Sequence, residues 1–191
     1  MGLVSRANFV GEDKTHTCTE SEMTMTETTT AESPVGATSD GRARVAADAA
    51  ARGIAIEFVD RPAADSLEAA AALLGIAPST IVKTLVVKRH DGTFLFALVP
   101  GDRQISWAKL RSVVGVNKLR LPEAAIALEA TGYERGTITP LGSSTPWPVF
   151  ADARIVGTRI AMGAGAQGLS AFVDAGALIS GLDATVADIS D

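Results

Sequence analysis

Several residue types are scarce in this chain of 191 residues, and each scarcity excludes a class of protein. A single cysteine, Cys18, excludes an internal disulfide framework. The two histidines, His16 and His90, lie in a predicted tail and a predicted turn, so no metal cluster is expected. No apolar run approaches the ~18 residues of a membrane span, and the N-terminus lacks the apolar core of a signal peptide. We therefore expect a cytoplasmic protein that needs no metal or cofactor and binds no membrane.

Net negative charge is also small outside the N-terminus. Residues 1–37 hold two basic and six acidic residues, which gives −4 of the total net charge of −5 and leaves −1 for the other 154 residues. Thr, Glu and Ser dominate this part of the chain, with little apolar surface to bury, so residues 1–38 are predicted to be a disordered tail and residues 39–191 one folded domain. A nearly neutral domain is not typical of a general nucleic-acid coat, but it is compatible with a local basic face.

From Ser39 onward, turn and cap signals separate short helices and strands. Ser39 or Asp40 is the predicted cap of the first helix, Ser66, Ser106 and Asp174 cap later helices, and Pro122 is expected at the first position of another. The predicted helices run through residue 52 and over 67–74, 107–114, 123–130 and 175–181, and the predicted strands over 54–60, 80–89, 94–100, 116–121, 149–152, 158–162, 169–173 and 184–189. Without strict alternation of helix and strand, the pattern favours a mixed α/β sheet or half-barrel over a doubly wound parallel sheet.

One lysine interrupts an apolar strand. In TIVKTLVVK, residues 80–88, alternation places Lys83 on one face with Ile81, Leu85 and Val87, and the other face is also largely apolar. Burial of an unpaired ammonium is costly, so such a lysine reaches water, forms an ion pair or lines a cleft. Periodicity alone leaves open whether Lys83 is structural or is aimed at an anion or a polarised carbonyl.

Two glycine-containing loops follow. GAGAQG, residues 163–168, fits the G-x-G-x-x-G pattern of dinucleotide sites, and Asp183 lies 20 residues beyond Gly163. However, the next residues, LSAFV, indicate a strand rather than a helix, and too little chain remains for the sheet that normally follows. A hairpin connection is the commoner interpretation. The second loop, GTITP at 136–140, is by itself a turn whose N–H groups can face an anion.

A run of basic residues lies between the lysine strand and the two glycine loops. The charged residues from 103 to 120 are all basic, namely Arg103, Lys109, Arg111, Lys118 and Arg120. Such a run can steer a phosphate backbone, or it can be a solvated helix face and strand rim.

Taken in order, four segments resemble a known family. They are KTLVV (83–87), FALVPGDRQIS (96–106), TGYERGTITPLG (131–142) and, near the C-terminus, GLSAFVDAGAL with TVADIS. Over roughly residues 42–190 they are similar to the YbaK/ProX family of aminoacyl-tRNA deacylases, which also occurs as the editing domain of bacterial prolyl-tRNA synthetases.

The resemblance implies a compact mixed α/β domain that hydrolyses the ester of a mischarged aminoacyl-tRNA, with a small amino acid and prolyl-tRNA as the expected substrate class. It implies that Lys83 is catalytic and contacts the 3′-terminal nucleotide or its ester. It further implies a substrate-binding loop made of Gly136, Thr137, Ile138, Thr139 and Pro140. By the same resemblance, a second glycine loop borders the pocket and contributes Gly163, Gly165 and Gly168, together with Ser170, which lies two residues after Gly168. The implied partners are the acceptor end of aminoacyl-tRNA and, as an open alternative, an aminoacyl-tRNA synthetase; no metal is implied.

This sequence departs from the family pattern at several positions. Thr137 and Thr139 replace a glycine and a serine of the loop that clears cysteine from prolyl-tRNA, Ala166 and Gln167 replace a basic pair, and Ser170 replaces an aspartate. These changes put cysteine specificity in question more than the class of reaction. Two other functions therefore stay open: a module of the same fold that binds tRNA or a synthetase with little catalysis, and a small-nucleotide binder that uses GAGAQG.

Overall fold

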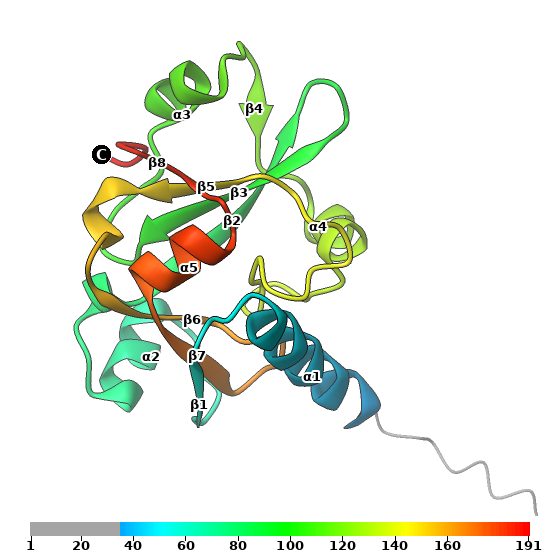
Figure 1. Ribbon diagram of the computed structural model, residues 1–191, viewed down its shortest axis with the longest axis vertical. Helices are drawn as coiled ribbons and strands as arrows, with labels where there is room; N and C mark the ends of the chain where they lie inside the picture. Colours follow the sequence, from blue (N-terminus) through cyan, green and yellow to red (C-terminus); the bar gives the residue numbers. More distant parts are fainter. Residues whose placement is uncertain (1–34) are drawn as a thin grey trace, which may run out of the picture. The chain divides into compact units, whose positions relative to one another are not determined.

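The computed structural model describes the backbone of residues 35–191 and the side chains from residue 40 onward (Figure 1). Its helices are α1 (Val35–Ala51), α2 (Leu67–Leu74), α3 (Trp107–Val114), α4 (Ala124–Thr131) and α5 (Ala175–Gly181). Its strands are β1 (Ile56–Asp60), β2 (Val82–Arg89), β3 (Phe94–Pro100), β4 (Leu119–Arg120), β5 (Val149–Asp152), β6 (Arg159–Gly163), β7 (Leu169–Asp174) and β8 (Thr185–Ala187). The tail predicted for residues 1–38 lies outside the described residues up to position 34.

The strands form two sheets, which confirms the mixed α/β class. One sheet has three antiparallel strands in the order β1-β7-β6. The other has the order β4-β2-β3-β5-β8, in which β2 pairs antiparallel with β3 and β4 while β3, β5 and β8 are parallel. An isolated parallel bridge between Ile81 and Ala161 joins β2's start to β6. The two sheets therefore meet beside the lysine strand.

Alternation along β2 and β3 divides the hydrophobic core in two. Val86 and Phe96 face the larger core, which is shared with α1, α5 and the three-stranded sheet. Val87 and Leu95 face a smaller core covered by α3 and the C-terminal segment, through Leu110 and Ile189. Every residue of β3 is buried, as expected for a strand in the interior of a sheet.

Most predicted helix ends are confirmed. The Ser66 side chain accepts a hydrogen bond from the Ala69 N–H, and Gly75 ends α2 with a φ of 65°. Asp174 likewise accepts from the Ala177 N–H at the start of α5. These short helices are thus delimited by local chemistry that is visible in the sequence.

Two helix starts were predicted wrongly. Helix α1 begins at Val35, so Ser39 and Asp40 lie inside the helix and do not cap it. The Asp40 carboxylate lies 3.9 Å from the guanidinium of Arg44, one turn later. Helix α4 begins at Ala124 after an extended Glu123, so Pro122 precedes the helix and does not occupy its first position.

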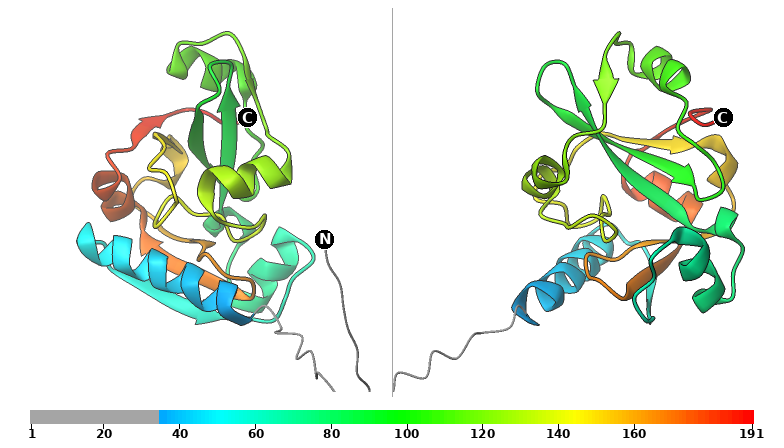
Figure 2. Two further views of the ribbon diagram at one scale, coloured as in Figure 1. Left: turned by 90° about the vertical axis from the view of Figure 1, so that its right-hand side faces the viewer. Right: turned by 180° about the vertical axis from the view of Figure 1, so that it is seen from behind.

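Helix α1 lies along the three-stranded sheet, and α3 lies at the far end of the molecule beside β4 (Figures 1 and 2). Val45 and Ala49 of α1 are fully buried in the larger core. Among the described residues, no helix has the length and apolar character needed to cross a membrane.

Candidate active site

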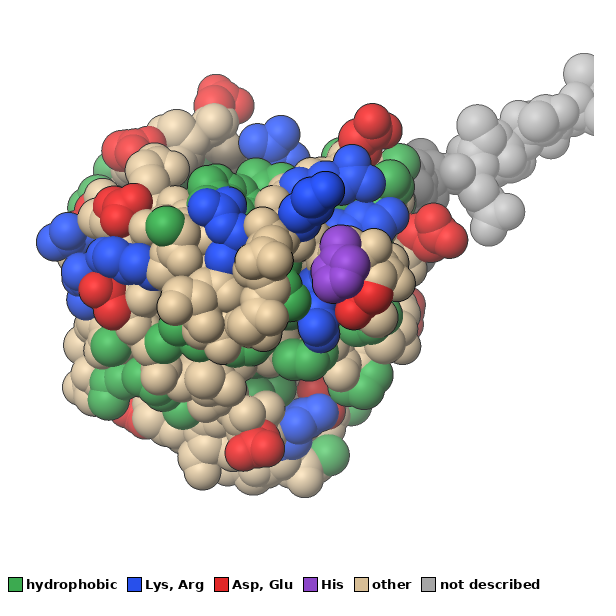
Figure 3. All heavy atoms as spheres, turned by 90° about the horizontal axis from the view of Figure 1, so that it is seen from above, with side chains coloured by type: hydrophobic (Ala, Val, Ile, Leu, Met, Phe, Trp, Pro, Cys, Tyr) green, Lys and Arg blue, Asp and Glu red, His purple; other side chains and the backbone are tan. Residues whose placement is uncertain are grey.

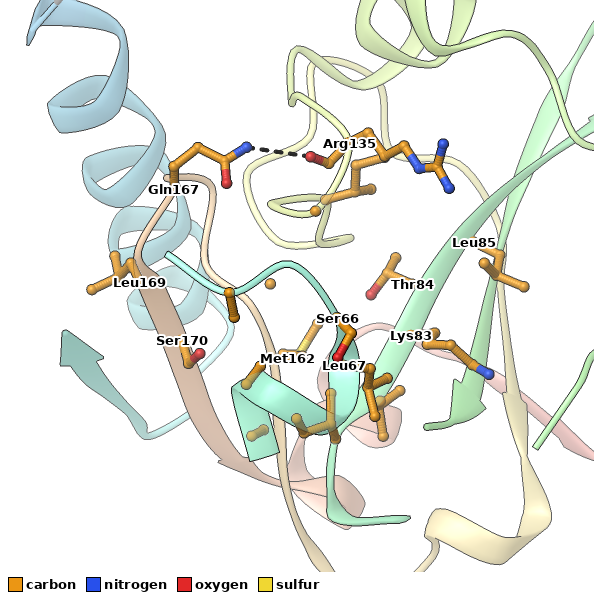
Figure 4. Close-up of a pocket in the computed structure, with 18 of the residues that line it drawn as sticks. Ser66, Leu67, Lys83, Thr84, Leu85, Arg135, Met162, Gln167, Leu169 and Ser170 are labelled. Atoms are coloured by element: carbon orange, nitrogen blue, oxygen red, sulfur yellow. Dashed lines mark hydrogen bonds between the residues drawn. The ribbon is translucent and has the colours of Figure 1, made fainter. Parts of the chain in front are cut away.

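A cleft of about 640 Å³ opens where the two sheets meet (Figure 4). The segment Val82–Val86 of β2 lines one side, and Ala161–Gly163 of β6 with Leu169 and Ser170 of β7 lines another. The remaining walls include α2 and the loop before it, Gly136 and Ile138, and the segment from β4 into α4. The cleft thus collects segments that are up to about a hundred residues apart in the chain.

Lys83 lies at the edge of this cleft. Its amine donates hydrogen bonds to the backbone carbonyls of Gly101 (3.1 Å) and Arg103, both in the loop that follows β3. Thr84, the next residue, projects from the opposite face of β2, and Figure 4 shows the two side chains diverging from the strand. Because an ammonium has three donors, the two carbonyls leave one N–H of Lys83 for another acceptor.

Burial and two nearby carboxylates act on the pKa of Lys83 in opposite directions. Partial burial lowers the pKa of Lys83 below its ordinary value, while the negative charges of Asp102 and Glu68 act in the opposite direction. A cation with incomplete hydration binds an anion or a polarised carbonyl more strongly than a solvated one does.

The GTITP loop divides between the cleft and the interior. Gly136 and Ile138 line the cleft, whereas Thr137 and Thr139 are buried. The Thr137 hydroxyl donates to the Glu134 carbonyl at 2.9 Å, and the Thr139 hydroxyl accepts from the Leu141 N–H at 3.3 Å. Pro140 is also buried and does not line the cleft. Hence Thr137 and Thr139, which replace a glycine and a serine of the family pattern, stabilise the loop on its buried side.

Backbone donors are available on the cleft side of this loop. The Thr137 N–H is used by the Glu134 carbonyl, at 3.0 Å. Within the described residues, the N–H groups of Gly136 and Ile138 have no acceptor. Unpaired backbone donors beside a cleft are suited to an oxyanion or a carbonyl oxygen.

The GAGAQG segment is the hairpin between β6 and β7, not a dinucleotide loop. Strand β7 starts directly after it, at Leu169, and pairs antiparallel with β6. Gly165 and Gly168 have φ of 78° and 68°, which a side chain would strain, and neither lines the cleft. A hairpin without a following helix offers no helix N-terminus to a pyrophosphate, so the nucleotide interpretation is wrong.

The two glycine loops are joined by a backbone hydrogen bond and by one from the side chain of Gln167. The Gly165 N–H donates to the Thr137 carbonyl at 2.9 Å, and the Gln167 amide donates to the Arg135 carbonyl at 3.3 Å. A Cβ on Gly163 would lie 2.4 Å from the Ile138 carbonyl oxygen, so only glycine permits this approach. The structure therefore brings together Lys83, Gly136, Ile138, Gly163 and Ser170 in one cleft.

Ser170 has a cationic partner that the sequence did not reveal. The Arg61 side chain donates to the Ser170 hydroxyl at 3.0 Å and to the Pro62 carbonyl at 3.1 Å, and the Arg61 N–H donates to the Gly168 carbonyl. Arg61 follows β1 directly, and β1 pairs with β7. These hydrogen bonds hold the Arg61 guanidinium at the cleft. Its partner at position 170 is the neutral hydroxyl of Ser170, and not the aspartate of the family pattern.

The charged and polar cleft residues that the sequence analysis did not assign to a site include Arg61, Asp65, Thr84 and Arg135. Arg135 immediately precedes the GTITP loop, and Thr84 immediately follows Lys83, so proximity to the motifs was the only available signal. Among residues 40–191, no three His, Cys, Asp or Glu side chains gather as a group able to hold a metal ion. The side chains that give the cleft its chemistry are therefore mainly cationic and hydroxylic.

Helix α1 holds the loop that carries the cleft donors. Arg44 donates to the carbonyls of Gly142 (3.0 Å) and Thr131 (3.2 Å) and stacks over the Tyr133 ring at 4.3 Å. The buried Tyr133 hydroxyl donates to the Leu141 carbonyl at 2.9 Å. Burial raises the pKa of Tyr133, and Arg44 acts in the opposite direction. These contacts fix both ends of the segment that contains GTITP.

Comparison with known proteins identifies the nature of this domain. The model of the aminoacyl-tRNA editing domain family matches residues 61–179, which is more than half of the chain. The proline–tRNA ligase of Thermosipho africanus is 39% identical over 88 residues, and that of Desulfovibrio desulfuricans is 36% identical over 113 residues. These matches cover 46% and 59% of this chain but only 16% and 19% of the ligases, so the chain spans less than a fifth of the length of these curated relatives.

Two crystal structures have the same fold. A hypothetical protein superposes with a TM-score of 0.73 at 27% identity, over 78% of this chain and 99% of that protein. A candidate trans-editing enzyme for prolyl tRNA synthetase superposes with a TM-score of 0.72 at 26% identity, over 79% of this chain and 97% of that protein. Both are therefore similar to this domain over almost their full length.

Proposed function

The chain belongs to the aminoacyl-tRNA editing domain family, and from that premise we propose that it is a trans-acting hydrolase that cleaves the ester of mischarged aminoacyl-tRNA. The observation that carries the proposal is the cleft, which Lys83 lines together with Gly136 and Ile138 of the GTITP loop. The likeness to a candidate trans-editing enzyme for prolyl tRNA synthetase supports prolyl-tRNA as the substrate. Such a substrate is met in the cytoplasm.

The proposed reaction needs no protein nucleophile. The oxygen of a water molecule bonds to the ester carbonyl carbon, and the carbonyl oxygen becomes an oxyanion that accepts hydrogen bonds from the N–H groups of Gly136 and Ile138. The bond from this carbon to the ribose oxygen then breaks, and the proton from the water passes to that ribose oxygen. Lys83 remains protonated throughout and binds the 3′-terminal nucleotide or its ester.

The walls of the cleft favour a small amino acid. Ala127, Ala161, Met162 and Ile138 supply apolar surface around the loop donors. Discrimination by such walls is limited, because one methylene is worth only about 1–3 kcal/mol. Since Thr137 and Thr139 face the interior, these two departures from the family pattern leave the cleft surface largely unchanged, which supports retained activity.

A panel of mischarged tRNAs tests the proposal. Prolyl-tRNA carrying alanine, cysteine or serine, and the correctly charged prolyl-tRNA, are each incubated with the protein, and the remaining ester is measured over time. We expect at least one mischarged ester to be cleaved well above the rate in buffer and the correct ester to be spared. Cleavage of none of them overturns the proposal.

A catalytically weak module that binds tRNA or a synthetase is the second candidate. It is favoured by Ser170, because Arg61 has no carboxylate partner within residues 40–191, and by Ala166 and Gln167, which stand where the family pattern has a basic pair. This candidate predicts that the protein retains tRNA in a binding assay while the panel shows no turnover. Turnover of any ester excludes it.

A further inference from the structure

A cluster of positive charge lies where β2 and β4 end, beyond the mouth of the cleft. We define the basic strip as Lys88, Arg89, Lys118 and Arg120. Lys118 and Arg120 are exposed, and Lys88 and Arg89 are partly exposed. Figure 3, which views this end of the molecule, shows Lys and Arg side chains gathered around the one described histidine. Because the domain as a whole is nearly neutral, this concentration is local.

The strand register sets like charges against each other. Lys88 lies directly opposite Arg120 in the antiparallel β2–β4 pair. Like charges in this position destabilise a sheet, although the Lys88 amine also lies over the Phe94 ring, 5.6 Å from its centre. A polyanion bound next to both cations would offset their mutual repulsion.

Counter-charges are sparse on the strip, whereas the basic cluster at the C-terminal segment is paired. Arg89 lies 3.6 Å from Asp91. Within residues 40–191, no carboxylate lies within 4.0 Å of the charged groups of Lys88, Lys118 or Arg120. By contrast, Lys109 and Arg154 at the C-terminal segment pair with Asp188, at 3.1 and 2.8 Å. The strip therefore keeps a net positive charge, unlike the cluster of Lys109 and Arg154.

The strip continues the wall of the cleft. Val82–Val86 of β2 line the cleft and Lys88 and Arg89 end the same strand, while Arg120 is followed directly by Leu121 and Pro122, which also line it. At about 3.3 Å per residue, the backbone from Lys83 to Lys88 spans roughly 17 Å. That is the length of about five stacked nucleotides, at ~3.4 Å per phosphate along one strand.

From this geometry we infer that the basic strip binds the phosphodiester backbone of the RNA whose esterified 3′ end occupies the cleft. The inference rests on the proposed function for the identity of the ligand. With the ester in the cleft beside GTITP, the nucleotides that precede it run along the face of β2 that carries Thr84 and Val86, toward Lys88 and Arg120. Arg61 and Arg135, which line the cleft itself, would face the phosphates nearest to the ester.

The test separates the strip from the catalytic cleft by substrate length. The variant Lys88→Gln/Arg120→Gln is compared with wild type on a full-length mischarged tRNA and on the same aminoacyl ester of a CCA trinucleotide, which is too short to reach the strip. On the tRNA we expect kcat/KM to fall roughly tenfold at low salt, and the slope of log(kcat/KM) against log[salt] to become shallower by about two. On the trinucleotide ester we expect no change.

Arg42→Gln/Arg159→Gln is the matched control, because it removes the same charge from residues that lie against Phe58 and Glu57 on the three-stranded sheet. It should leave both substrates unaffected. Equal losses on the two substrates, or an unchanged salt slope in the strip variant, would overturn the inference.

Binding of uncharged tRNA, followed by fluorescence anisotropy, keeps the two proposals distinguishable. The first possible result is that no ester is cleaved but tRNA binds, and that the strip variant binds it more weakly with a shallower salt slope. In that case the hydrolase proposal fails, and the inference that the basic strip binds RNA is upheld. If wild type and strip variant bind tRNA alike, the strip is excluded whatever the activity. A wild type that binds no tRNA excludes it as well.

Discussion

The carboxylate of Asp48 in α1 accepts a hydrogen bond from the backbone N–H of Gly142, at 2.9 Å. Arg44, one turn earlier, donates to the carbonyl of the same glycine at 3.0 Å. Gly142 has a φ of 65°, and a Cβ there would lie 2.6 Å from the backbone of Arg44, so helix and loop are in direct contact. Helix α1 lies ahead of the segment matched by the family model, yet it holds the loop that carries the cleft donors.

The first prediction follows from this contact. Arg44→Ala should lower the free energy of unfolding by about 1–2 kcal/mol, because it removes partly buried hydrogen bonds to several carbonyls. If the loop shifts, kcat should fall about tenfold, which corresponds to ~1.4 kcal/mol of transition-state stabilisation. Urea unfolding and single-turnover deacylation measure the two effects. The control Arg42→Ala, on the same helix, should preserve activity; an Arg44→Ala enzyme with unchanged kcat would contradict a positioning role.

The second prediction concerns Gly163. Gly163→Ala should destabilise the domain by roughly 2–4 kcal/mol, since the new Cβ meets backbone oxygen atoms of Ile138 and Thr137 at 2.4 and 2.7 Å. Thermal unfolding checks this. Gly176→Ala in α5 is the control, because its Cβ would meet only the Asp174 carboxylate, at 3.1 Å, and alanine favours a helix. Equal melting temperatures for the two variants would show that the glycine loops are not closely packed.

The third prediction concerns Thr84. Its hydroxyl is buried and has no hydrogen-bond partner among the described residues. Replacing it by a methyl group removes this cost, so Thr84→Val should raise the free energy of unfolding by about 1 kcal/mol. Thr84→Ser, which keeps the hydroxyl, should not. A destabilised Thr84→Val protein in urea unfolding would mean that the hydroxyl has a partner.

The fourth prediction concerns acid stability. Burial alone would raise the pKa of Asp152, but hydrogen bonds from the Arg154 backbone, Ser190, the Arg154 guanidinium and the Ile189 backbone outweigh it and lower the pKa. A lowered pKa in the folded state gives stability that is complete above the unfolded value of about 3.9 and is lost as the pH falls through the folded value.

Asp152→Asn should therefore cost about 2 kcal/mol at pH 7 and should flatten the loss of stability below about pH 4. Urea unfolding between pH 7 and pH 3 measures both. Asp60→Asn, at an exposed position, is the control and should follow wild type. A variant that loses stability with acid as steeply as wild type would contradict the assigned role of Asp152.

Local signals predicted much of this fold, and long-range contacts explain the rest. Ser66, Asp174 and the Asp-Gly turn act within a few residues, so the helix ends and the β2–β3 hairpin were predictable. The pairing of β1 with β7 and the bridge between Ile81 and Ala161 join residues far apart in the sequence, which no local pattern reveals. The start of α1 was missed because Ser39 and Asp40, which are good caps, are also tolerated within a helix.

The candidate site was predicted only in part, because it too depends on contacts between residues far apart in the sequence. Alternation correctly placed Lys83 on the face of Leu85 and Val87, which belongs to the smaller core, but it could not show that Gly101 and Arg103 would hold the amine. Arg61 meets Ser170 across 109 residues of chain, so only the β1–β7 pairing brings them together.

The measurement that tests the central claim most directly is the single-turnover rate of ester cleavage by wild type, Lys83→Met and Lys83→Arg on the preferred mischarged prolyl-tRNA. Methionine keeps the length of the side chain without its charge, and arginine keeps the charge. We predict that Lys83→Met loses at least a hundredfold in kcat/KM, or ~2.7 kcal/mol of transition-state stabilisation, and that Lys83→Arg recovers part of the loss. Cleavage by Lys83→Met at the wild-type rate would contradict the account.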